Sequence, residues 1–128
     1  MTKAIGIAAA AIALAICSLA EASTRRDWEG LTADEQRGYA FGAYDGLLIF
    51  NAGDEYGEAD SAAYVACLRA RPLTTDDLRT LINDGYTRDP SSLELPASGI
   101  LAQQLGQRCR TEVNRERQRH NLLSLRAR

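Results

Sequence analysis

Cysteine, histidine and carboxylate side chains are the residues of this chain that could carry chemistry. Cysteines stand at positions 17, 67 and 109, and the one histidine is His120. Nucleophilic catalysis needs a nucleophile with a base beside it, and His120 lies within an arginine-rich run. The sequence has no CxxC pair to begin a metal site. We therefore expect neither an enzyme nor a metal-binding protein, and no cofactor.

The first residues have the pattern of a cleaved export signal. Lys3 precedes an apolar run over residues 4–16, and residues 20–22 have the small-x-small pattern of a cleavage site. We expect residues 1–22 to be a signal peptide and 23–128 to be the mature chain. An uncleaved anchor is disfavoured by the short apolar run, and a lipid attached to Cys17 by the bulky Ile16 before it.

Removal of the signal leaves Cys67 and Cys109 as the only thiols, and such a pair in an oxidising compartment predicts a disulfide. The bridge would close a loop of about 40 residues, which the chain-entropy model values at about 4 kcal/mol. At 128 residues the chain has room for one domain. Its stability would therefore depend strongly on this bridge.

Acidic and basic residues are unevenly distributed. Without Lys3 and Glu21, the 15 basic and 17 acidic residues of the chain become 14 and 16. Residues 27–60 hold nine acidic residues and one arginine, whereas residues 108–128 hold seven arginines and two glutamates. We favour a solvated helix face, or an intramolecular complement to the acidic half, over nucleic-acid binding.

Capping patterns and apolar periodicity predict an all-α domain of about four helices. Thr32 with Glu35 has the pattern of a capping box, and apolar residues then recur at three- and four-residue steps to about 51–53. The acidic, glycine-containing segment 54–60 is predicted to be a loop, and residues 61–68 a short helix after it.

Two further helices follow. Thr74, with Asp77 three residues later, predicts a helix from Thr75 that ends before Pro90. Asp76 and Asp77 are explained by the dipole at that helix N-terminus. The last helix is expected from about Pro96, with a stripe that carries Cys109 and Val113 inward.

Glycines at 38, 42 and 46 lie four residues apart in the first helix, so one of its stripes has no side chains. Each costs about 1 kcal/mol of helix propensity, so we expect close packing there, within the chain or in a homodimer. Asp45 interrupts an otherwise apolar run, and we favour a cap or an arginine partner over a binding role. The aromatic residues expected in the core are Trp28, Tyr39 and Tyr44.

Several of these features occur together in one family pattern: GYAFGAYDG at 38–46, then Cys67, LTTDDL at 73–78, and a proline-led helix ending in Cys109. Over about residues 28–110 the chain resembles the Rap/Tai family of small exported helical proteins of Gram-negative bacteria. The matching positions are Gly38, Tyr39, Gly42, Asp45, Cys67, Leu73, Thr74, Leu78, Pro96 and Cys109. The core of the Rap/Tai-like domain would span about 28–113. The acidic segment 51–66 and the arginine-rich extension after Cys109 depart from the pattern.

The resemblance implies a periplasmic immunity protein, often dimeric, that inhibits a type VI secretion peptidoglycan amidase. We expect the partner to contact the acidic segment through Asp54, Glu55, Tyr56, Glu58 and Asp60. The alternative is a periplasmic stress protein similar to HdeA-like acid chaperones, or another exported helical protein without catalytic activity. Protonation of carboxylates at low pH would drive such a chaperone.

Overall fold

The computed structural model describes residues 24–50 and 53–125. The expected signal peptide, which includes Cys17 with its disfavoured lipid attachment, and the end of the first predicted helix at 51–52 lie outside these residues. The described residues form helices and no strands, which confirms the all-α class. Six α-helices and a 3₁₀ turn follow in the order α1 (Arg25–Gly30), α2 (Ala33–Phe50), α3 (Glu55–Ala70), α4 (Thr75–Arg88), η1 (Pro90–Ser92), α5 (Ala97–Arg108) and α6 (Arg110–Arg119). None of the described helices is long and apolar enough to cross a membrane.

Helix α1 was not predicted, because six residues are too short to show a periodic apolar face. The Thr24 side chain caps it by accepting a hydrogen bond from the Asp27 amide. Trp28 holds it in place: the indole is fully buried and donates from Nε1 to Asn83 Oδ1 at 2.7 Å. The prediction that Trp28 is a core residue is confirmed.

The predicted caps of α2 and α4 are confirmed. The Glu35 carboxylate accepts from the Thr32 amide, and the Thr32 hydroxyl accepts from the Glu35 amide. Thr74 and Asp77 make the same reciprocal pair at the start of α4. These bonds satisfy amides that have no partner within the helix, so each box defines where its helix begins.

Segment 54–60 is helical, and the prediction of a loop there was wrong. Asp54 is the N-cap of α3 and accepts from the Gly57 amide at 2.6 Å, so the helix begins at Glu55 and reaches Ala70. Acidic residues in a first turn favour a helix because they lie at the positive end of its dipole. Ala59, Ala63 and Cys67 form a buried stripe at four-residue steps, which outweighs the propensity cost of Gly57.

The predicted last helix is interrupted at Cys109 and continues as α6. At Cys109 the backbone dihedrals are φ −101° and ψ 13°, outside the regular α-helical values. Val113 remains fully buried beyond the break. Apolar periodicity therefore continues across the interruption, which is why the sequence pattern alone did not reveal it.

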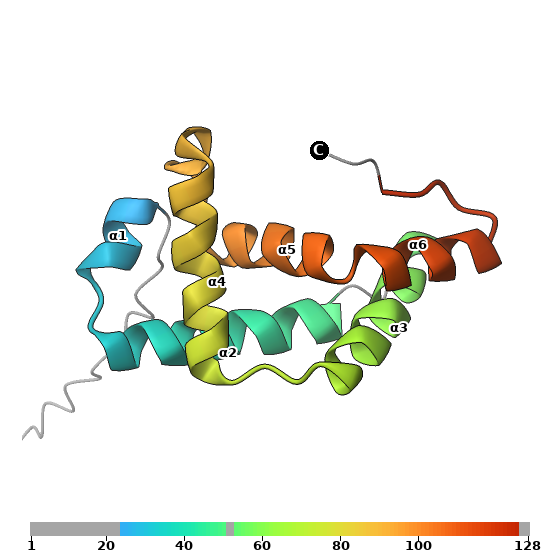
Figure 1. Ribbon diagram of the computed structural model, residues 1–128, viewed down its shortest axis with the longest axis horizontal. Coiled ribbons are helices and arrows are strands. Elements are labelled where there is room, and N and C mark those ends of the chain that lie inside the picture. The colour runs from blue at the N-terminus through green and yellow to red at the C-terminus, as the bar shows by residue number, and fades with distance from the viewer. Residues whose placement is uncertain (1–23, 51–52, 126–128) are drawn as a thin grey trace, which may run out of the picture.

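Two groups of helices build the core. Helices α2, α4 and α5 pack on one another, and α3 packs chiefly on α6 (Figure 1). At the α4–α5 crossing, a Cβ added to Gly85 would lie 2.3 Å from Ile100 Cγ2, so only glycine permits this approach. The buried cluster at these contacts includes Trp28, Ala40, Leu78, Ile82, Tyr86, Ile100, Leu101, Leu105 and Val113.

Candidate binding surface

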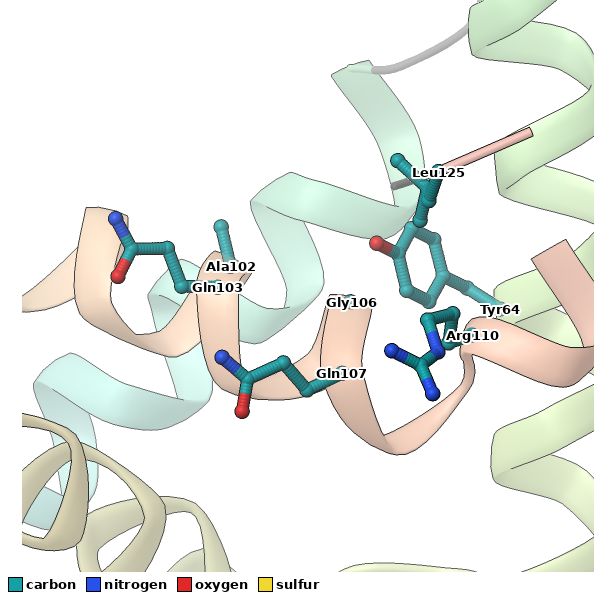
Figure 2. A pocket seen from close by; sticks show the side chains of 7 residues that line it. All are labelled: Tyr64, Ala102, Gln103, Gly106, Gln107, Arg110 and Leu125. Carbon is teal, nitrogen blue, oxygen red and sulfur yellow. The ribbon is translucent and has the colours of Figure 1, made fainter. Parts of the chain in front are cut away.

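A hollow of about 600 Å³ opens between α3, α5 and the last described residues. Ligand pockets of about 300 to 1,000 Å³ are typical of binding sites. Figure 2 shows the Tyr64 ring with Leu125 on one side and Arg110 on the other, while Gln103 and Gln107 extend from α5. The lining residues are Tyr64, Ala102, Gln103, Gly106, Gln107, Arg110 and Leu125.

Tyr64 is the central side chain of this hollow. Burial raises the pKa of its hydroxyl, and the nearby Asp60 charge raises it further, so the phenol stays neutral at physiological pH. A Cβ added to Gly106 would lie 3.4 Å from the Tyr64 hydroxyl oxygen, so α5 approaches this hydroxyl closely at the glycine. Tyr64 also lines a smaller hollow of about 230 Å³ with Leu47, Leu48, Asp60, Ala102 and Leu105.

A further hollow of about 450 Å³ lies along α6 and shares Arg110 with the first. Its other lining residues are Thr111, Asn114, Arg115 and Gln118. Arg110 and Arg115 make no ion pair within the described part of the chain. We call the amide and guanidinium side chains of the two hollows the α5–α6 face: Gln103, Gln107, Arg110, Asn114, Arg115 and Gln118.

Residues 120–125, here called the C-terminal strap, fold back after α6 (Figure 1). Asn121 has a positive φ of 56°, and the Leu122 and Asn121 amides donate to the carbonyls of Arg117 and Gln118. These two bonds form a Schellman motif, which ends the helix and turns the chain. The Leu125 amide then donates to Asn114 Oδ1 at 2.7 Å, so Leu125 becomes a wall of the first hollow.

Arg117 fastens α6 and the strap to α3. Its guanidinium donates to both carboxylate oxygens of Asp60, lies 5.0 Å from the centre of the Tyr56 ring, and donates to the Leu123 carbonyl at 3.2 Å. The Asp60 hydrogen bonds raise the pKa of Arg117 above its ordinary value. The sequence analysis expected basic residues of the last segment to pair with acidic residues of segment 27–60. The Arg117–Asp60 pair confirms this expectation.

The five predicted partner-binding residues fall into two groups, three with contacts that stabilise the fold and two on the exposed first turns of α3. Asp54 caps α3, Asp60 pairs with Arg117, and Tyr56 both contacts Arg117 and accepts from the Leu123 amide at 3.3 Å. These three side chains therefore stabilise the fold. Glu55 and Glu58 are exposed on the first turns of α3.

The glycine stripe of α2 is open, and the expectation of close packing within the chain was wrong. A Cβ added at Gly38, Gly42 or Gly46 would meet no atom within 4 Å in the described chain. Asp45, on the same helix, is exposed and has no ion pair there, so the preferred structural role is also not found. Tyr39 is half-buried and meets Trp28 edge-on, with 5.9 Å between the ring centres.

The predicted disulfide is confirmed. Cys67 in α3 and Cys109 after α5 are bonded, with 5.7 Å between their Cα atoms, and both are fully buried. Arg71, the C-cap residue of α3, donates to Cys67 Sγ at 3.1 Å and to Glu112 Oε1 at 2.9 Å beside the bridge. The bridge therefore joins α3, which carries Tyr64, to the junction of α5 and α6.

His120, the side chain that could most readily act as a base, lines none of these hollows. His120 is exposed, and its Nε2 lies 3.7 Å from Glu116 Oε1. Among the described residues, no group of three or more histidine, cysteine or acidic side chains is placed to hold a metal ion. No known family model, curated protein or solved structure matches this chain. The described surface has hydrogen-bond donors and acceptors, two arginines without ion pairs, and hollows lined by both polar and apolar side chains. Such features are suited to recognition.

Proposed function

We propose that this chain is a periplasmic binding protein of the immunity type, which inhibits a type VI secretion peptidoglycan amidase. The Rap/Tai-like pattern supports this function. The export pattern and the disulfide support the compartment, because disulfides persist in oxidising environments such as the periplasm. Four of the matching positions have structural roles that suit such a domain: Cys67 and Cys109 form the bridge, Thr74 caps α4, and Leu78 is in the core.

The observation that carries the proposal is how the chain uses its reactive groups. Both cysteines of the expected mature chain are oxidised and buried, and the histidine is exposed beside Glu116. The described surface exposes polar side chains. The disulfide and the capped helix ends limit the motion of the backbone that carries them. A preorganised surface of this kind favours binding because little conformational entropy is lost when a partner docks.

For the contact with the amidase we retain the acidic end of α3, now reduced to Glu55 and Glu58. These two carboxylates are exposed, so they are available to a partner, and they lie beside Tyr56, which is also partly exposed. We leave Asp54 and Asp60 out of the proposed contact because Asp54 caps α3 and Asp60 pairs with Arg117.

The experiment is co-expression of the full chain with an amidase effector encoded beside its gene and directed to the periplasm. We expect the chain to prevent lysis, and the purified mature protein to block peptide release from peptidoglycan. Glu55→Gln with Glu58→Gln should weaken inhibition, whereas Glu94→Gln, an exposed carboxylate after η1, should not. Lysis that continues at full expression of the chain would refute the immunity function.

The acid-chaperone alternative is distinguished by a second measurement. The pKa values of Glu35 and Asp77 are lowered by hydrogen bonds to Thr32 and Thr74, so these caps lose their contribution to stability as the pH falls through the lowered values. A chaperone would expose apolar surface at about pH 3 and keep an unfolded client soluble. An immunity protein need not do either.

A further inference from the structure

The α5–α6 face has three features that together restrict what it could bind. Its two arginines are unpaired within the described chain, its amides extend over two helices, and no carboxylate lines either of its hollows. The glutamates of α6 are used elsewhere, Glu112 by Arg71 and Glu116 by Arg119. The face is therefore locally positive, although the whole chain carries a formal charge of −2.

The chemistry of the face suits a polypeptide in extended conformation. Glutamine and asparagine amides both donate and accept, as a peptide backbone does, and a guanidinium binds carboxylates with two parallel hydrogen bonds. At the helical rise, positions 103–108 extend over about 7.5 Å in α5 and positions 110–118 over about 12 Å in α6. Together these lengths correspond to about six residues of an extended strand.

The placement of the two cations restricts the sequence that would fit. Arg110 and Arg115 line the same hollow, with Asn114 as a further lining residue. Carboxylates on alternate residues of an extended peptide are separated by about 6.6 Å and project from one side. A segment with acidic residues at alternate positions would therefore present its carboxylates on one side, towards the hollow that both arginines line.

We propose that the α5–α6 face binds an extended acidic segment of the protein partner, with acidic residues at alternate positions. The first hollow would receive an apolar side chain of that segment between Tyr64, Ala102 and Leu125, while the amides hold its backbone. This inference rests on the proposed function for the nature of the partner, but the face can be tested without it. A nucleic acid is disfavoured, because two free arginines between amides are few charges for a phosphate backbone.

The test uses a fluorescent peptide of about eight residues, alternating glutamate with threonine and blocked at both ends, titrated with the mature protein. We expect saturable binding, weakened about fivefold or more by Arg110→Gln and by Arg115→Gln, since each removes a charge-assisted contact. Arg26→Gln is the matched control, because it removes the same charge from an exposed position on α1. A peptide with glutamine for glutamate should bind about tenfold more weakly or worse.

Three results would overturn the inference: no saturation by the glutamate peptide, an equal loss with Arg26→Gln, or tighter binding of a single-stranded oligonucleotide than of the peptide. Amidase inhibition separates this inference from the proposed function. If the protein inhibits the amidase but does not bind the peptide, only the inference about the face fails. If Arg110-dependent peptide binding occurs and no amidase is inhibited, the immunity function fails and the face stands.

Discussion

Arg117 and Asp60, 57 residues apart in the chain, form a two-point ion pair between α6 and α3. Guanidinium Nε and Nη2 lie 2.7 and 2.6 Å from the two carboxylate oxygens, and the side chains are only 13% and 19% exposed. Such parallel hydrogen bonds align two planar groups and are stronger than a single contact. The pair therefore fixes how α6 and the strap sit on α3, beside the first hollow.

Removing one member of this pair should destabilise the protein measurably. Arg117→Gln leaves the Asp60 carboxylate partly buried without its cation, and we expect a loss of about 2 kcal/mol in the free energy of unfolding. Urea denaturation measures it. Arg119→Gln, which breaks only an exposed pair with Glu116, should cost less than about 0.5 kcal/mol. Equal losses in both variants would contradict the structural role of the Asp60 pair.

The disulfide should contribute a large part of the stability. Its cysteines are 42 residues apart, and the chain-entropy model assigns about 4 kcal/mol to a bridge of this length. Cys67→Ala with Cys109→Ala should lower the unfolding free energy by about that amount, as should reduction of the native protein in denaturant. An unchanged urea midpoint in the double variant would show that α3 and α6 hold together without the bridge.

Two glycines should respond to alanine in opposite directions. Gly85→Ala places Cβ against Ile100 Cγ2, and overpacking of this kind costs about 1 to 3 kcal/mol. Gly42→Ala meets no atom within 4 Å and should stabilise α2 by up to about 1 kcal/mol through helix propensity. Thermal unfolding of the two variants checks both signs. Destabilisation by Gly42→Ala would reveal a contact at the open stripe, such as one with a second copy.

Tyr86 should make stability depend on alkaline pH. Burial, assisted by neighbouring acidic groups, raises its pKa from 10.0 to about 12, and its hydroxyl donates to the Leu95 carbonyl at 2.6 Å. The unfolded chain then loses this proton at lower pH than the folded chain does. The contribution is therefore complete below pH 10 and declines as the pH rises towards about 12.

Thermal unfolding at a series of alkaline pH values tests this dependence. Tyr86→Phe should cost about 1 kcal/mol at neutral pH, because the Leu95 carbonyl loses its donor. It should also flatten the decline in stability at high pH, since phenylalanine does not titrate. The same decline in Tyr86→Phe as in the native protein would assign the effect to another group.

Local sequence patterns were sufficient for much of the fold and for little of the surface. Thr32 with Glu35 and Thr74 with Asp77 revealed two helix starts, because a capping box uses only residues three apart. Asp54 is likewise an acidic N-cap, but the glycines at 53 and 57 are typical of a loop and obscure the helix start in the sequence. The sequence feature that does indicate a helix there is the four-residue spacing of Ala59 and Ala63, which are both buried in the structure.

The sequence by itself determined the helical class, two of the caps and, once an oxidising compartment was inferred, the pairing of Cys67 with Cys109. These depend on residue type and short spacing, which are written directly in the chain. Only the tertiary structure decided that Asp60 is paired with Arg117, that the glycine stripe is open and that Leu125 closes a hollow beside Tyr64. Each of these depends on how helices distant in sequence approach one another, and periodicity within one helix carries no information about that approach.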